Sequence, residues 1–151
     1  MLTRRNALAL FAAAPAALAL GRPALAMTPE IYAEAGIAID GSDTVAYFAG
    51  NGPVAGSEAF STDWRGAKWL FSSAENLALF EADPEAYAPQ YGGYCAWAAA
   101  QGYIAATHPN AWTIYEGKLY LNANRNIRRR WERDIPGFIT QGDANWPGIL
   151  S

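Results

Sequence analysis

Thiol and imidazole groups are nearly absent from this sequence. Among 151 residues there is one cysteine, Cys95, and one histidine, His108. One cysteine cannot form a disulfide bond within the chain. Structural zinc takes four Cys or His ligands, catalytic zinc takes three protein ligands, and blue copper takes two His and a Cys. The chain can complete none of these sets unless carboxylates or a second subunit take part.

The motifs of the common enzyme classes are also missing. The sequence contains no G-x-S-x-G elbow, Walker loop, H-E-x-x-H helix or Rossmann fingerprint. Asp40 and Asp43 flank Gly41-Ser42, and we interpret them as turn formers rather than as a paired acid and base. No residue pattern supports catalysis, and whether the protein is an enzyme stays open.

Positive charge is scarce beyond the first 26 residues. Three of the 11 Lys and Arg residues lie in that segment, which leaves eight against 14 Asp and Glu, a net charge of −6. An acidic domain lacks the basic face that nucleic acid binding requires, so we expect no nucleic acid partner. Five arginines nevertheless cluster near the C-terminus, and we interpret them as the solvated face of one helix: Arg125, Arg128, Arg129, Arg130 and Arg133.

The first 26 residues have the pattern of an export signal. Arg4-Arg5 precede an apolar run from Ala7 to Leu20, and Ala24-Leu25-Ala26 fits a signal peptidase site. "TRRNAL" resembles a twin-arginine signal, with the general secretory route as the alternative. The run is too short for a transmembrane helix, which needs roughly 20 apolar residues. We therefore expect cleavage near Ala26/Met27, a periplasmic or otherwise exported product, and no membrane span in the mature chain.

Residues 27–151 are expected to form one small α+β domain. "EAFSTDWRGAKWLFSS" and "AWTIYEGKLYLN" each predict a β-hairpin, with turns at Arg65-Gly66 and Glu116-Gly117. Ser72 or Ser73 is expected to cap a following helix, and Asn122 or Asn124 to cap the arginine-rich one. A further short helix is predicted from Tyr94 to Gln101. With many aromatic residues, the prediction is two β-hairpins and three to four short helices around an aromatic-rich core.

Three stretches resemble the YHS-domain family. They are "DGSDTVAYF", "WRGAKWLFSSAENLALFEADPEAYAPQYGGYCAWA" and "GKLYLN", so the resemblance runs from about Gly36 to Pro147. It is closest to the exported bacterial branch with a single YGGYCA block, a branch without a settled activity. Other branches carry cysteines and are regarded as metal-binding. The matching positions here are Ala46, Ser72 and Asn76, none of which has a thiol, so the resemblance implies no metal site of that type.

The stretch "YAPQYGGYCAWAAAQG" contains the candidate site. If Cys95 lies in the first turn of the predicted helix, the free N–H groups and helix dipole would stabilise a thiolate. Gly92 and Gly93 would let a ligand approach that helix start, and Tyr91 and Tyr94 could supply hydroxyl donors. The alternative is that Cys95 is a small core residue among aromatic residues and alanines.

A metal site is a further possibility at Cys95. It would combine Cys95 with His108 and a carboxylate, Asp43 or Glu75, around a transition metal such as copper or zinc. His108 precedes a proline and is therefore expected in a loop, where a surface position is the common case. Its proximity to Cys95 as a nucleophilic pair cannot be read from spacing.

Three hypotheses for the function follow. The first is a metal- or small-ligand-binding module centred on Cys95, with Tyr91, Gly92, Gly93 and Tyr94 around it. The second is a thiol-dependent redox protein that uses Cys95 as a reactive thiolate. The third is a structural or interaction domain with no small-molecule site, whose aromatic-rich surface contacts a protein partner. Burial of Cys95 and the polar groups near its sulfur distinguish the three.

Overall fold

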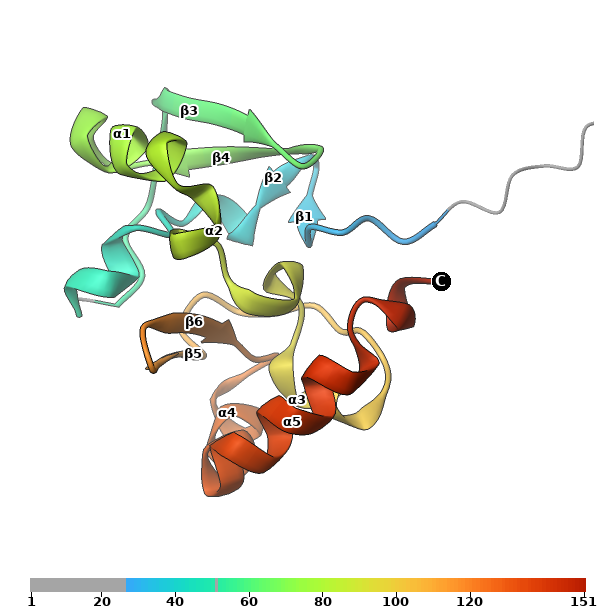
Figure 1. Cartoon of the computed structure of the whole chain (residues 1–151). Helices are drawn as coiled ribbons and strands as arrows, with labels where there is room; N and C mark the ends of the chain where they lie inside the picture. Colours follow the sequence, from blue (N-terminus) through green and yellow to red (C-terminus); the bar gives the residue numbers. More distant parts are fainter. Residues whose placement is uncertain (1–26, 51) are drawn as a thin grey trace, which may run out of the picture.

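The computed structural model describes residues 27–50 and 52–151. The predicted export signal, residues 1–26, lies outside the described residues, so export stays a prediction that N-terminal sequencing of the secreted protein would check. Figure 1 shows two halves, each built around its own small sheet, with a yellow-green segment between them. Within the described part of the chain, no helix has the length and apolar content needed to cross a membrane.

The first half contains a four-stranded sheet in the order β1-β2-β4-β3. Its strands are β1 (Ala33–Glu34), β2 (Ile37–Ala38), β3 (Ser57–Trp64) and β4 (Ala67–Phe71). Two helices follow, α1 (Ala74–Ala82) and α2 (Pro84–Tyr87), and two 3-10 turns cover Ile39–Gly41 and Ala46–Ala49. Strand β2 pairs with β4 in parallel, whereas β1 with β2 and β3 with β4 are antiparallel.

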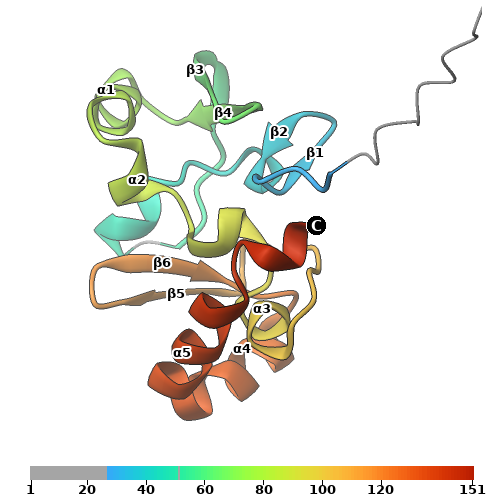
Figure 2. The ribbon, with the colours of Figure 1, turned by 45° about the vertical axis from the view of Figure 1, so that its right-hand side comes forward.

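The second half contains a two-stranded sheet and three helices. The strands are β5 (Trp112–Tyr115) and β6 (Lys118–Leu121). The helices are α3 (Ala96–Gln101), α4 (Arg125–Trp131) and α5 (Ile135–Asn145), with 3-10 turns at Glu132–Asp134 and Gly148–Leu150. Helix α3 packs against α5, an arrangement also visible in Figure 2. The predicted α+β class is confirmed, and the described residues contain five α-helices.

Both predicted hairpins are present, and their turns explain why. Arg65 and Gly66 have φ of 48° and 80°, and Glu116 and Gly117 have φ of 48° and 75°. Positive φ at both central residues is the type I′ arrangement, whose twist matches that of the paired strands. The turns therefore set the register, which pairs Trp64 with Ala67 in one hairpin and Tyr115 with Lys118 in the other.

Both predicted helix caps are present, at Ser73 and Asn124. The Ser73 hydroxyl accepts the Asn76 N–H at 3.1 Å, and the Asn124 side chain accepts the Ile127 N–H at 2.9 Å. Each bond satisfies a backbone donor that the first helical turn leaves free. The predicted start at Tyr94 is wrong: α3 begins at Ala96, because Tyr94 and Cys95 are in extended conformations after a 3-10 turn.

The core consists of two hydrophobic clusters rich in aromatic residues. The first lies mainly in the first half and includes Leu119 and Leu121 of β6, and the second lies mainly in the second half and includes Tyr91. In the first, Trp69 packs against Phe80 with ring centroids 5.0 Å apart, and Phe71 lies at the same distance from Phe80. In the second, Tyr120 packs on Trp131 at 4.9 Å. All of these side chains are buried. The 3-10 turn Gln90–Gly93 lies between the halves and leads into α3.

Candidate functional site

The space beside the two glycines of the predicted site is occupied by the protein itself, by the Glu30 backbone at Gly92 and by the Pro89 side chain at Gly93. A Cβ atom on Gly92 would lie 1.8 Å from the Glu30 carbonyl oxygen, and the Tyr32 N–H donates to the Gly92 carbonyl at 2.9 Å. A Cβ on Gly93 would lie 3.2 Å from Pro89 Cγ. Gly92 and Gly93 also have φ of 63° and 87°, which glycine adopts without strain. The glycine pair therefore lets the segment around Glu30 cross the chain, and no ligand passes through it to Cys95.

The two tyrosines flanking the glycines direct their hydroxyl groups away from Cys95. The Tyr91 hydroxyl donates to Asp143 Oδ1 at 3.0 Å, and the Tyr94 hydroxyl donates to the Pro29 carbonyl at 2.8 Å. Burial raises the pKa of both phenols, and for Tyr91 the hydrogen bond to Asp143 raises it further. Both side chains tie distant parts of the chain to this block as neutral donors.

Cys95 is a buried residue with one polar side-chain neighbour. It is 1% exposed, and its Sγ lies 3.5 Å from Asn122 Oδ1, which also accepts the Trp97 N–H at 2.9 Å. Burial raises the pKa of the Cys95 thiol, and backbone N–H groups of Trp97, Ala98 and Ala123 offset that rise only in part. The thiol is therefore protonated at neutral pH, which does not favour the reactive thiolate of the second hypothesis.

The residues proposed as metal ligands lie in different surroundings. His108 is exposed, and its Nδ1 accepts the Asn110 N–H at 3.1 Å. Glu75 is exposed on α1, whereas Asp43 is fully buried. No three His, Cys, Asp or Glu side chains of the described chain are grouped so that they could hold a metal ion. The structure therefore does not bring Cys95, His108 and a carboxylate together.

Asp43 instead accepts hydrogen bonds from three separate segments. Its Oδ1 accepts the N–H groups of Val45 and Ala46 at 2.9 and 3.2 Å. Its Oδ2 accepts the N–H and hydroxyl of Ser72 at 2.8 and 2.6 Å, and the Asn76 amide at 2.8 Å. A buried carboxylate requires such donors to compensate for its lost hydration. Asp43 is thus a structural centre, and its oxygens are already saturated.

A cleft opens on the other side of the Tyr91-Gly92 segment. Its volume is about 320 Å³, and the aromatic residues that line it are Trp64, Tyr91 and Trp146. The charged residues at the cleft are Glu30, Arg65, Glu85 and Lys118. They come from the N-terminal segment, the β3–β4 turn, α2 and β6, so the cleft lies where the two halves of the fold meet. Tyr91 and Gly92 are the two predicted site residues that line it.

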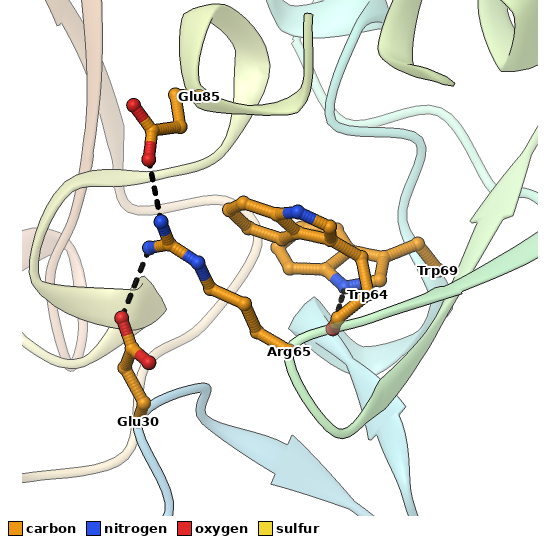
Figure 3. Close-up of polar contacts among 5 residues, drawn as sticks. All are labelled: Glu30, Trp64, Arg65, Trp69 and Glu85. Carbon is orange, nitrogen blue, oxygen red and sulfur yellow. Dashed lines mark hydrogen bonds and ion pairs between the residues drawn. The ribbon is translucent and has the colours of Figure 1, made fainter.

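Arg65 is the central charged group of this cleft, as Figure 3 shows. Its Nη1 donates to Glu30 Oε1 at 2.9 Å, and its Nη2 donates to Glu85 Oε1 at 2.5 Å. Its Cζ lies 4.3 Å from the centroid of the Trp64 ring, a cation–π distance. Trp64 is in turn fixed by its neighbour, since the Trp69 indole N–H donates to the Trp64 carbonyl at 3.1 Å. The guanidinium group is therefore held in a defined position and orientation.

From the sequence alone, Arg65 is expected only as a turn residue. A signal was available, because the first central position of a type I′ turn strongly favours Asn, Asp or Gly. Arginine there departs from turn preference, but Glu116 departs from it equally in the second hairpin, so this signal alone does not single out Arg65. The partners Glu30 and Glu85 lie 35 and 20 residues away in the chain, so no local pattern identifies them.

Comparisons with known proteins leave the family open. No family model, no curated protein sequence and no solved structure matches this chain.

A second surface hollow contains no aromatic residue; it is lined by His108, Asn110, Asn124, Arg125 and Asn126. The Arg65 cleft combines aromatic walls with both signs of charge, and it is the better candidate for a ligand site.

Proposed function

We propose that this protein is a YHS-type binding module that holds a small organic ligand in the Arg65 cleft. The observation that carries the proposal is the composition of the cleft: three aromatic residues and four charged ones around about 320 Å³. Sites for small molecules are typically concave, about 300 to 1,000 Å³ in volume, and contain a few fixed polar groups among apolar ones. This cleft lies at the small end of that range, and its lining is more polar than is usual. Arg65 is such a group, because Trp64 and two carboxylates hold it in place.

The surroundings of Asp43 support the YHS part of the proposal. The resemblance aligns Ala46, Ser72 and Asn76 with the cysteine positions of metal-binding branches. All three lie against one group, since the Ala46 N–H, the Ser72 hydroxyl and the Asn76 amide each donate to the Asp43 carboxylate. Positions up to 30 residues apart therefore meet at one group, which supports the resemblance. On this proposal, the hydrogen-bonded Asp43 carboxylate occupies the region where the cysteine-bearing branches would bind a metal.

The contacts of Cys95 favour ligand binding at the cleft over chemistry at the thiol. Its sulfur is buried, its pKa is raised, and its side-chain partner is an amide. We therefore assign the ligand site to the cleft that Tyr91 and Gly92 line, and not to Cys95. Export, predicted from residues 1–26, would place this binding module outside the cytoplasm.

A fragment screen with a blocked variant tests the proposal. Gln90 lines the cleft and Gln101 is exposed at the end of α3, so Gln90→Trp and Gln101→Trp form a matched pair. We expect aromatic fragments to shift the backbone amide NMR signals of cleft residues in the wild type and in Gln101→Trp. Gln90→Trp should weaken the same fragments at least about tenfold, because the new indole occupies their space. If no fragment shifts the cleft signals at millimolar concentration, the interaction-domain hypothesis is favoured instead.

A further inference from the structure

We infer that the ligand of this cleft carries a carboxylate, and that Glu85 occupies the ligand's place on Arg65 until it binds. The inference rests on the proposed function, because it names the chemistry of that same site. Its first support is the way Arg65 is bound. Glu30 and Glu85 each take a single N–H of the guanidinium fork. A planar fork of this kind can hold one carboxylate through two parallel bonds, which is a stronger arrangement.

Of the two carboxylates, Glu85 is the one that can leave. The side chain of Glu85 is 71% exposed, against 50% for Glu30 and 39% for Arg65. Ion pairs this exposed contribute about 0 to 1 kcal/mol, so a ligand displaces Glu85 at little cost. Glu30 has less freedom, since its backbone is pressed against Gly92 and the nearby Tyr32 N–H is bonded to the Gly92 carbonyl.

The charges that remain after Glu85 turns away favour an anion. Lys118 lines the same cleft from the start of β6 and forms no ion pair with any described residue. With Glu85 displaced, Arg65 and Lys118 would face Glu30 alone, an excess of one positive charge. A ligand carboxylate restores neutrality after it displaces Glu85, whereas an ammonium group would leave Glu85 on Arg65 and meet a cleft that is already neutral. The aromatic residues at the cleft then suit a flat apolar body attached to that carboxylate.

Three probes with the same indole ring and different charges separate the contribution of the carboxylate to binding from that of the ring. They are indole-3-acetate, the neutral alcohol indole-3-ethanol, and tryptamine, and each is titrated by NMR against the full mature chain. We expect indole-3-acetate to bind about tenfold more tightly than the alcohol, because a charge-assisted bond to Arg65 forms only with the acid. Tryptamine should bind more weakly than the alcohol.

Two variants assign the preference to the proposed groups. Glu85→Gln removes the internal carboxylate and should tighten indole-3-acetate about two- to fivefold while leaving the alcohol unchanged. Glu81→Gln on α1 is the matched control, since it removes the same charge outside the cleft and should have a smaller effect. Arg65→Asn keeps a residue suited to the turn and should abolish the preference for the acid.

The possible outcomes distinguish failure of the carboxylate inference from failure of the proposed ligand-binding function. If no probe and no library fragment shifts the cleft signals, the proposed function fails and the inference fails with it. If the alcohol or the amine binds the cleft as tightly as the acid, the carboxylate inference alone is overturned. The same holds if Glu85→Gln tightens the acid no more than Glu81→Gln does.

Discussion

The segment from Tyr91 to Cys95 separates two regions of opposite character. On the Cys95 side, the thiol and its partner Asn122 are buried and packed by the alanines of α3. On the cleft side, Arg65, Glu85 and Lys118 are exposed around an open volume. The single cysteine of the sequence lies in the closed region, whereas an arginine assigned to a turn lies at the centre of the open one.

This difference shows what decides whether a residue is available for chemistry. Cys95 has the more reactive functional group, but its surroundings keep it neutral and inaccessible. Arg65 is a common residue whose contacts are weak enough to exchange and whose position is nevertheless fixed. Access and exchangeable contacts therefore identify the site better than residue type does.

Substitution of Gly92, which lies in the segment between the two regions, should reduce stability the most. Gly92→Ala places a methyl group 1.8 Å from the Glu30 carbonyl at a φ of 63°, so the Glu30 segment must move. We expect a loss of at least about 3 kcal/mol in the free energy of unfolding, measured by urea denaturation. Gly50→Ala is the control: its φ is 81° but nothing lies within 4 Å of the added methyl, so only about 1 kcal/mol should be lost. Equal losses in the two variants would show that Glu30 does not press on Gly92.

The closed region should respond to Cys95→Ala in stability and in its pH dependence. Removing a buried sulfur should cost about 1 to 2 kcal/mol through a small cavity. The folded thiol has a raised pKa, so the unfolded chain loses its thiol proton first, near pH 8.5. Wild-type stability therefore falls relative to Cys95→Ala as pH rises above about 8.5, and the difference between the two proteins is constant below it.

Urea denaturation from pH 7 to 10 checks the Cys95 prediction. Reaction of the native thiol with Ellman's reagent should also be slow, and should become fast in denaturant. Rapid labelling of the native protein at pH 7 would mean that Cys95 is accessible and would revive the thiol hypothesis.

The open region should give the smallest change in stability. Arg65→Asn removes two exposed ion pairs, and we expect the free energy of unfolding to change by less than about 1 kcal/mol. Arg128→Gln on α4 breaks the solvent-accessible pair with Glu132 in the following 3-10 turn. It is the matched comparison and should give a similar value. A much larger loss for Arg65→Asn would assign the Glu30–Arg65–Glu85 cluster to holding the two halves together.

Patterns among residues close in sequence predicted the turns and helix caps of this fold more accurately than they predicted the candidate site. The turns at Arg65-Gly66 and Glu116-Gly117, and the caps at Ser73 and Asn124, depend on contacts within four residues, and all four are confirmed. The predicted helix start at Tyr94 is wrong because residues far along the chain hold this segment. The Cys95 N–H donates to the Ala105 carbonyl, and the Tyr94 hydroxyl donates to Pro29.

The structure of the candidate site depends almost entirely on contacts between residues that are far apart in the sequence. Gly92 was expected to admit a ligand, and the Glu30 segment, about 60 residues earlier, occupies that space. The local prediction that Asp43 forms a turn agrees with its bonds to the Val45 and Ala46 N–H groups. Its bonds to Ser72 and Asn76, which leave no place for a metal ion, could not be read from spacing. Side-chain type could be read from the sequence, whereas the partner of each side chain required the fold.

The two ends of the domain lie close together, since the Thr28 N–H donates a hydrogen bond to the Leu150 carbonyl at 3.3 Å. This closeness makes the domain suitable for insertion into another protein. Figure 1 shows the C-terminus beside the N-terminal segment, so both junctions of an inserted copy would leave from one edge of the domain. Glu30 and Trp146, a few residues inside each junction, both line the cleft. Spliced into a loop of a fluorescent host, the domain would hold its cleft within a few residues of both junctions, which is the starting arrangement for a genetically encoded sensor.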